Sequence, residues 1–331
     1  MPTIDTNWQY HGLRVVRIEN ELVCLDVLPE LGAKIYSFFY KPADRHLLWH
    51  NPHLPPTRPP FGASFDDNWS GGWDELIPND LPRPTPEGEM LPDHGEVWSQ
   101  AAACEIVSSN ARRCEVRFTV YGRVLPTRFA KTIRLEAGDP FVRVAYAFSN
   151  MGPAPIDFLW NIHPALAVTP DTWLEVPAAC GITDPWRETR FPGNAGFDWP
   201  FAVDHGGQPI DLRRVDPPES ALADMHYLVN VEAGWYAATD RSTQTGFALV
   251  FPREVFPHVW LFRALGGWRG LYTVILEPST GFPYDLEVAR RNRTCGHLAT
   301  GETLEAEILA IGYHGISRVA RVEEDGSVVA G

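Results

Sequence analysis

Three residues of the sequence combine side chains and neighbours that suit proton transfer. His94 lies in the segment Pro-Asp-His-Gly-Glu, His163 in Asn-Ile-His-Pro, and Glu277 in Ile-Leu-Glu-Pro. An imidazole and a carboxylate serve as general acid and base because their surroundings can bring both pKa values near neutrality. His163 and Glu277 each follow an apolar run, so we expect each at the end of a strand. If those strands are neighbours, the two side chains face each other at the rim of a sheet.

Each of these signals also has a structural interpretation, because a single His or Glu at a strand end is often only part of the packing. A metal site built from His94, Glu96 and His163 is a weaker alternative, since these residues lack tight ligand spacing. The sequence has no dinucleotide fingerprint, phosphate-binding loop, nucleophile elbow or zinc-protease motif. No cofactor is expected, because proton transfer alone would suffice.

The elements that must hold these residues are strands almost throughout. Runs of β-branched and aromatic residues separated by Gly, Pro, Asn and Asp predict an all-β protein. We expect strands at residues 13–18, 22–28, 33–40, 47–49, 114–120, 128–136, 141–150, 156–162, 234–238, 245–251, 259–262, 272–276, 303–313, 319–322 and 327–330. The sequence lacks long amphipathic helices and fixed-period repeats, so it predicts one large antiparallel β fold.

One long segment interrupts this pattern of strands. Residues 52–98 are rich in Pro and Gly and also contain many Trp, Asp, Glu and His residues. A solvated linker between domains would be less aromatic, so we interpret the segment as a functional loop within a single domain of residues 1–331. Its tryptophans could stack on the faces of sugar rings, although they could equally fill the core.

Composition and charge narrow the range of partners. The chain has 331 residues, with 28 Lys and Arg against 42 Asp and Glu, which gives a net charge of −14. Such a charge disfavours nucleic acid and anionic membranes as partners. The five scattered cysteines and the absence of an N-terminal leader pattern predict a cytoplasmic protein. The oligomeric state is left open.

The order of the short motifs resembles the aldose 1-epimerase, or galactose mutarotase, family over about residues 15–312. Asp93-His94-Gly95 resembles the first histidine motif of that family, and Asn161-Ile-His163 resembles its Asn-x-His motif. Leu276-Glu277-Pro278 resembles the segment that carries its catalytic base. The resemblance implies a large antiparallel β-sandwich, the galactose mutarotase-like supersandwich, with an open sugar cleft.

The resemblance also implies roles for individual residues. Glu277 would be the general base, His163 the acid that protonates the ring oxygen, and His94 a residue that orients that oxygen. Substrate binding would fall to Trp73, Asp74, Glu75 and Asp224. The first three stand where typical galactose mutarotases carry an Asn-Arg pair, so galactose itself is not implied. Arg263 is a further predicted substrate-binding residue, which could hold an anionic group of the sugar.

The function predicted from these observations is the interconversion of sugar anomers by acid–base ring opening of a small-molecule sugar. Two alternatives remain open. One is a carbohydrate-binding protein that has the cleft but no turnover. The other is an epimerase for a sugar phosphate or sugar acid, in which Arg187, Arg190 or Arg263 would hold the anion.

Overall fold

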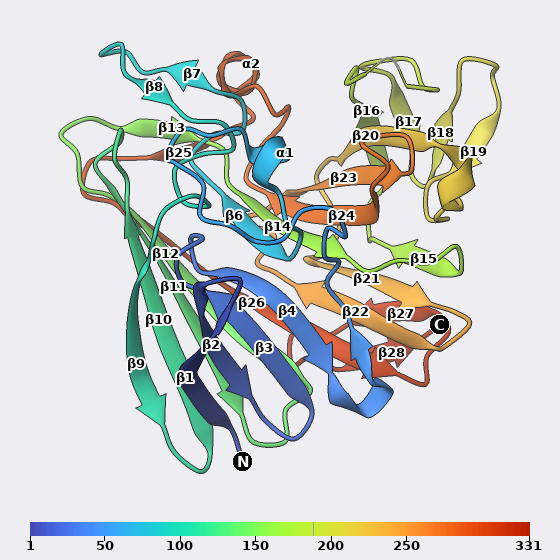
Figure 1. The fold of residues 1–331 in the computed structure, drawn as a ribbon. Helices are drawn as coiled ribbons and strands as arrows, with labels where there is room; N and C mark the ends of the chain where they lie inside the picture. Colours follow the sequence, from blue (N-terminus) through green and yellow to red (C-terminus); the bar gives the residue numbers. More distant parts are fainter. Residues whose placement is uncertain (188) are drawn as a thin grey trace.

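A computed structural model describes residues 1–187 and 189–331 of the chain. Two large antiparallel sheets, of 14 and 8 strands, pack against each other and enclose the main hydrophobic core (Figure 1). The alternation of apolar and polar residues explains this packing, because it gives each strand one face to bury. In β10, for instance, Val116, Phe118 and Val120 are buried, whereas Arg117 faces solvent.

The larger sheet carries the central strands of the site. In spatial order its strands are β1 (Thr3–Tyr10), β2 (Leu13–Glu19), β3 (Val23–Leu28), β4 (Lys34–Tyr40), β6 (Trp73–Leu76), β14 (Asn161–Leu166), β24 (Tyr272–Ser279), β23 (His258–Leu265), β20 (Leu222–Leu228), β16 (Cys180–Thr183), β17 (Gly196–Asp198), β18 (Phe201–Val203) and β19 (Pro209–Asp211), with β5 (Arg45–His46) beside β4.

The smaller sheet covers the other side of the core. Its strands in spatial order are β15 (Thr172–Glu175), β21 (Trp235–Asp240), β22 (Thr245–Val250), β26 (Thr303–His314), β12 (Phe141–Asn150), β11 (Thr127–Glu136), β10 (Arg113–Tyr121) and β9 (Ala103–Ser109). Three hairpin-sized pairs complete the sheets: β7 (Arg83–Pro84) with β8 (Met90–Leu91), β13 (Ile156–Phe158) with β25 (Gly296–Leu298), and β27 (Val319–Val322) with β28 (Val328–Ala330). The helical segments are α1 (Phe65–Asn68), α2 (Leu286–Asn292), and the 3₁₀ turns η1 (Lys41–Ala43) and η2 (Pro218–Ser220).

The predicted all-β fold is confirmed, and most predicted strands lie within a few residues of their expected bounds. The main misses are β1, β9 and β20, whose sequences have weak or polar alternation, and β6, which lies inside the segment 52–98 that was predicted to be a loop. No strand was expected between residues 170 and 218, yet this region contributes β15 to β19. The missed strands lie at sheet edges or pair with distant segments, so their local sequence carries little of the signal.

The predicted strand over residues 156–162 is wrong in one respect, because it is two strands. The chain leaves β13 at Leu159 and Trp160 and enters β14 in the larger sheet. The amide of Leu159 donates to the carbonyl of Pro78 at 2.8 Å, and that of Trp160 donates to the Thr280 hydroxyl at 2.9 Å. These bonds satisfy the backbone donors where the chain changes sheets.

Two prolines lie inside strands, directly after the residues that were expected at the strand ends. β14 continues through Pro164, and β24 continues through Pro278 to Ser279. A proline lacks a backbone donor, so it tends to interrupt a ladder of hydrogen bonds. The pairing of β14 with β24 has such an interruption, between Asn161 opposite Ser279 and Ala165 opposite Ile275. Neighbouring strands on the far sides, β6 and β23, keep both segments extended.

A buried ion pair joins the two sheets through the core. Lys131 of β11 donates to Glu75 of β6 at 3.1 Å, and the Tyr146 hydroxyl of β12 donates to the same oxygen at 2.8 Å. The Glu75 and Lys131 side chains are each about 1% exposed. Burying charge costs free energy unless it is paired, so each group depends on the other.

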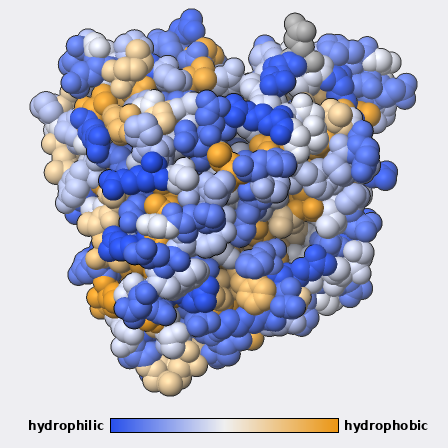
Figure 2. Space-filling view, in the orientation of Figure 1, coloured by the Kyte–Doolittle hydropathy of each residue, from blue (hydrophilic) through white to orange (hydrophobic). Residues whose placement is uncertain are grey.

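Within the described residues, none of the helices is long and apolar enough to cross a membrane. The face seen in Figure 2 is predominantly hydrophilic, and its hydrophobic residues are scattered rather than gathered into one broad patch.

Removing one member of the buried ion pair should destabilise the fold strongly. We expect Glu75→Leu to lower the free energy of unfolding by about 3–5 kcal/mol, because it leaves the Lys131 charge buried and unpaired. The double variant Glu75→Leu/Lys131→Met should recover most of this loss. Urea denaturation measures both. The exposed pair Glu105–Arg117 provides the control, since Glu105→Ala should cost no more than about 1 kcal/mol. A loss in the double variant as large as in the single variant would contradict this account.

Candidate functional site

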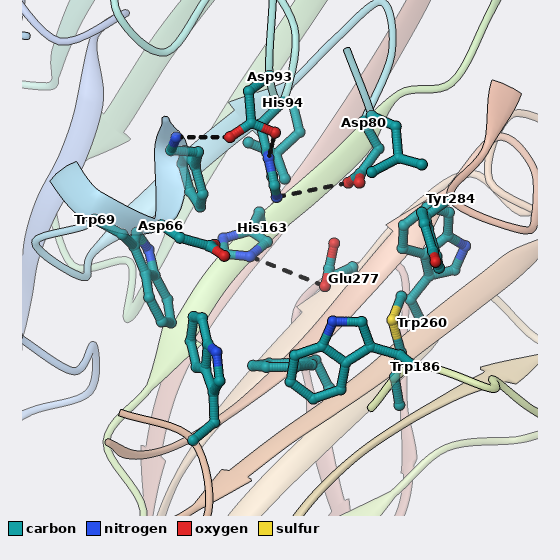
Figure 3. Close-up of a pocket in the computed structure, with 16 residues that line it drawn as sticks. Asp66, Trp69, Asp80, Asp93, His94, His163, Trp186, Trp260, Glu277 and Tyr284 are labelled. Carbon is teal, nitrogen blue, oxygen red and sulfur yellow. Dashed lines mark hydrogen bonds and ion pairs between the residues drawn. The ribbon is translucent and has the colours of Figure 1, made fainter. Parts of the chain in front are cut away.

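The larger sheet carries a cavity of about 220 Å³ on its face away from the smaller sheet. Its floor is formed by side chains of β6, β14, β24, β23 and β20, and its walls by α1 and by the loops that follow β6, β8, β16, β23 and β24 (Figure 3). The sequence-predicted residues His94, His163 and Glu277 all line it. The structure therefore brings together three side chains that are far apart in the sequence.

His163 and Glu277 face each other across the interruption between β14 and β24. The register that pairs Asn161 with Ser279 places them directly opposite, and His163 Nε2 lies 4.0 Å from Glu277 Oε1. Because directly opposite residues of antiparallel strands point to the same face, both side chains enter the cavity. The expectation that their strands are neighbours is confirmed, although both residues lie within strands rather than at strand ends.

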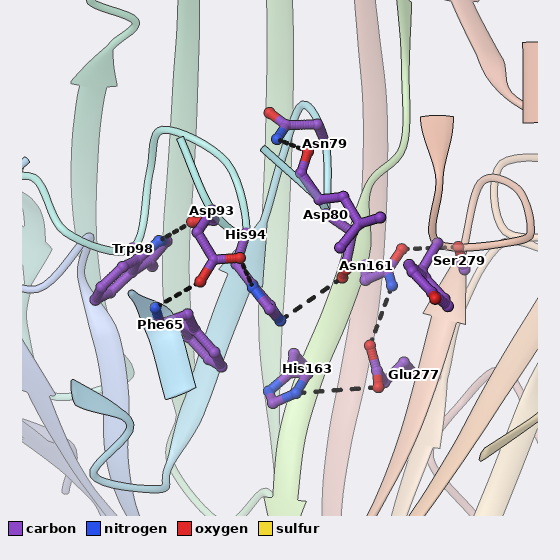
Figure 4. Close-up of polar contacts among 12 residues, drawn as sticks. Phe65, Asn79, Asp80, Asp93, His94, Trp98, Asn161, His163, Glu277 and Ser279 are labelled. Atoms are coloured by element: carbon purple, nitrogen blue, oxygen red, sulfur yellow. Dashed lines mark hydrogen bonds and ion pairs between the residues drawn. The ribbon is translucent and has the colours of Figure 1, made fainter. Parts of the chain in front are cut away.

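Glu277 is held by a short chain of hydrogen bonds along the sheet. Asn161 Nδ2 donates to Glu277 Oε2 at 3.1 Å, and the Ser279 hydroxyl donates to Asn161 Oδ1 at 2.8 Å (Figure 4). Burial raises the pKa of Glu277 to about 8, and the nearby charge of Asp80 adds to the increase, while the Asn161 bond opposes it. At pH 7 the carboxyl of Glu277 therefore holds a proton most of the time.

Burial also makes His163 neutral, but it does so by lowering the pKa of the imidazole. Burial lowers its pKa to about 3, and the positive charges of His94 and Lys34 add to the decrease. The side chain is about 8% exposed, and its Nδ1 atom has no hydrogen-bond partner among the described residues. The His163 imidazole is therefore neutral at physiological pH.

His94 is positioned by a tight crossing of two loop segments. Its backbone amide donates to the carbonyl of Asp80 at 2.6 Å, and the next residue, Gly95, forms a bridge with Ile77. Gly95 has φ of +82°, and a Cβ there would lie only 2.1 Å from the carbonyl oxygen of Ile77. Only glycine fits this approach, which explains its place directly after the histidine.

Two carboxylates keep His94 charged. Its Nδ1 lies 2.8 Å from Asp93 Oδ1 and its Nε2 lies 3.8 Å from Asp80 Oδ2, while its ring stacks on Phe65 at 4.3 Å between centroids (Figure 4). Burial alone would lower the pKa of His94, but Asp80 and Asp93 outweigh it and raise the pKa to about 9. Of the three residues predicted to transfer protons, His94 is thus an imidazolium, His163 a neutral imidazole and Glu277 a buried carboxyl.

Asp93 is itself fixed in place. Its other carboxylate oxygen accepts a hydrogen bond from the Phe65 amide at 2.8 Å, and its carbonyl accepts one from Trp98 Nε1 at 2.9 Å. These contacts connect α1 to the end of the long loop. They explain why the tryptophan-rich segment is ordered around the cavity rather than extended into solvent.

The three predicted binding residues of β6 lie inside the protein and do not line the cavity. Trp73 and Glu75 point into the core between the sheets, where Glu75 pairs with Lys131. Asp74 shares the cavity face of the sheet but is buried against Lys34 at 3.1 Å. Their predicted substrate-binding role has no support in this geometry, because Asp74 and Glu75 each pair with a buried lysine and Trp73 is part of the core.

Asp224 and Arg263 also lie away from the cavity. Strand register explains why: Met225 and Phe262 line the cavity, so their neighbours in β20 and β23 point to the opposite face of the sheet. There Arg263 donates to both carboxylate oxygens of Asp224, at 2.6 and 2.8 Å. The pair is almost completely buried, so Arg263 does not reach the cavity.

The remaining residues that were considered for anion or metal binding do not line the cavity, except for His94 and His163. Arg190 pairs with Asp216 at 3.3 Å, and Arg187 lies over the Trp186 ring outside the cavity lining. Glu96 accepts bonds from the backbone amides of residues 123–125 rather than facing His94. In the described part of the chain, no group of three His, Cys, Asp or Glu residues is arranged to hold a metal ion.

Sequence reasoning missed much of the cavity lining. The missed polar residues are Asp66 and Asp80, and the missed aromatic residues include Trp186, Trp260, Phe262, Trp268 and Tyr284. Asp80 had a usable signal, because it directly follows Pro78-Asn79 and precedes His94 in the same loop. The aromatic residues come from four separate segments, and only the fold brings them together.

Comparison with known proteins identifies the architecture. No family model matches the sequence, and no curated protein matches it. Among solved structures, a provisionally named aldose 1-epimerase from Klebsiella pneumoniae superposes with a TM-score of 0.75 at 12% identity, covering 95% of this chain and 83% of that one. The fold is that of the galactose mutarotase-like proteins.

Further solved structures agree with this result. A galactose mutarotase-like protein from Lactobacillus casei gives a TM-score of 0.65 at 16% identity, covering 90% of this chain and all of that one. A galactose mutarotase-like protein from Clostridium acetobutylicum gives 0.63 at 10% identity, covering 95% and 99%. The resemblance found in the sequence is thus confirmed for the fold, and the galactose mutarotase-like sandwich spans nearly the whole chain.

The charge on His94 should depend on Asp93. We expect Asp93→Asn to lower the pKa of His94 by at least about one pKa unit, because an opposite charge in contact typically shifts a pKa by 1–3 units. NMR titration of ¹⁵N-labelled histidine side chains measures it. Asp67→Asn, which changes an exposed carboxylate outside the cavity, is the control. An unchanged His94 titration in Asp93→Asn would show that this carboxylate does not maintain the charge.

Proposed function

We propose that the protein interconverts the anomers of a free sugar by opening and reclosing its ring. The observation that carries the proposal is the pairing, in one cavity, of the imidazolium of His94 with the buried carboxyl of Glu277 beside neutral His163. Anomer exchange needs an acid for the ring oxygen and a base for the anomeric hydroxyl, and both must act in both directions. The fold shared with galactose mutarotase-like proteins supports the same reaction class.

The chemical step uses only proton transfers. The ionised Glu277 takes the proton of the C1 hydroxyl while the C1–O5 bond breaks and His94 gives its proton to O5. The product is the open-chain aldehyde, with Glu277 protonated and His94 neutral. Rotation about the C1–C2 bond and reversal of both transfers close the ring as either anomer and restore the starting protonation states.

This assignment exchanges the roles that the sequence resemblance implies for the two histidines. His163 is neutral because of its burial, whereas His94 carries the charge that an acid must have. His163 then acts as a neutral hydrogen-bonding group beside Glu277. Aromatic side chains around the cavity offer surfaces for the apolar faces of a sugar ring.

Loss of either proton-transfer group should greatly slow anomer exchange. We expect Glu277→Gln and His94→Gln each to lower the catalysed rate by about 10² or more, which is typical of losing a general base or acid. Anomeric exchange measured by NMR over a panel of aldoses and amino sugars tests this. Glu175→Gln, which changes a buried carboxyl in the smaller sheet, is the control. Full activity in Glu277→Gln, or no catalysis of any sugar by the native protein, would contradict the proposal.

The pH dependence of kcat/KM should identify Glu277 as the base and His94 as the acid. Since Glu277 must lose its proton to act, kcat/KM should rise with pH through about 8. Since His94 must keep its proton, kcat/KM should fall again above about 9. Spontaneous exchange is subtracted at each pH, and His163→Gln should keep both limbs at a lower rate. A rate that is constant from pH 6 to pH 9 would rule out these groups as the acid and base.

A further inference from the structure

The cavity contains more negative than positive charge. Four carboxyl groups line it, those of Asp66, Asp80, Asp93 and Glu277, together with the two imidazoles. No Lys or Arg among the described residues belongs to the lining. His94 can balance only one carboxylate and His163 is neutral, so the lining holds an excess of negative charge even while Glu277 is protonated.

Asp80 is the carboxylate best placed to act on a ligand. Its side chain is about 13% exposed, and its only ionic contact in the described structure is with His94 at 3.8 Å, which is longer than a hydrogen bond. Figure 3 shows it at the side of the cavity that also holds Glu277 and Tyr284. Burial raises the pKa of Asp80 to about 6, as expected for a carboxylate that lacks a full complement of partners.

The wall of the cavity near Trp186 is aromatic. Trp186, Phe262 and Trp268 pack edge to face, with ring centroids 5.1 to 6.0 Å apart. The faces of aromatic rings attract cations. Two such cation–π contacts are present outside the cavity lining, where Arg187 lies over the Trp186 ring and Arg269 lies over the Trp268 ring.

The negative charge and the aromatic wall of the cavity indicate a class of substrate for the proposed reaction. Building on that function, we propose that the cavity selects a sugar carrying an ammonium group, with Asp80 as the residue that determines this preference and Asp66 as a second carboxylate ligand. A neutral sugar could form hydrogen bonds with the carboxylates but would leave the excess negative charge of the cavity unbalanced. A sugar with a phosphate or carboxylate group would increase that negative charge.

A bound cation would also help the chemistry. Glu277 holds its proton at pH 7 most of the time, whereas the proposed base must be ionised. A positive charge on the sugar favours the ionised carboxylate, because opposite charges nearby lower a carboxyl pKa. The ammonium group would therefore bind most strongly to the form of the site that is ready to react.

Equilibrium binding tests the proposal independently of turnover. The probes are 2-amino-2-deoxyhexoses, each compared at pH 7 with its parent hexose, its N-acetyl derivative and the hexose 6-phosphate, by isothermal titration calorimetry on the native protein. We expect the amino sugar to bind at least about tenfold more tightly than the three others, since a hydrogen bond between charged groups is stronger than one between neutral groups. Asp80→Asn should remove most of this preference, and Asp66→Asn should reduce it.

The control is Asp67→Asn, because Asp67 neighbours Asp66 on α1 but is about 65% exposed and lies outside the cavity. It should leave the preference unchanged. Equal or weaker binding of the amino sugars, including no binding of any sugar, overturns the proposal, as does a preference that survives in both Asp80→Asn and Asp66→Asn. Tighter binding of the 6-phosphate that is lost in Arg187→Ala would place an anion at the rim instead. Anomer exchange of neutral sugars without any preference for amino sugars would overturn only this inference and leave the proposed function standing.

Discussion

The opposition of His163 and Glu277 across β14 and β24 is the constraint on which the site depends. Both side chains are buried at the centre of a wide sheet, where ionising either of them costs free energy. Pro164 and Pro278 lie next to them in sequence, and the two strands lack paired positions between Asn161 and Ala165. The hydrogen-bond ladder is therefore interrupted beside the two cavity-lining groups, while β6 and β23 keep the strands in position.

The distribution of charge follows from this burial. A neutral imidazole and a protonated carboxyl share the sheet, and the one imidazolium is displaced to the loop, where Asp80 and Asp93 can stabilise it. Two neighbouring histidines therefore have very different pKa values, because one has carboxylate partners and the other does not. Environments that separate pKa values in this way are characteristic of acid–base sites.

Much of the fold could be predicted from the sequence because alternation and turn residues are local signals. The three central side chains could also be found, since each lies in a short motif beside Pro or Gly. Their partners could not: Asp80 and the aromatic wall come from separate segments that only the tertiary structure brings together. Asp224 and Arg263 were predicted to bind substrate but do not line the cavity. Successive residues of a strand point to opposite faces of the sheet, and these two point away from the cavity. The charged residues of β6 were misinterpreted because their buried partners, Lys34 and Lys131, lie far away in the sequence.

The most direct test of these protonation states is to locate the protons on His94, His163 and Glu277 in the protein without added sugar. Neutron diffraction from a deuterated crystal at pH 7 would show them. The account predicts deuterium on both ring nitrogens of His94, on one ring nitrogen of His163, and on the carboxyl of Glu277. A doubly protonated His163 beside an ionised Glu277, with His94 neutral, would contradict it and return the acid role to His163.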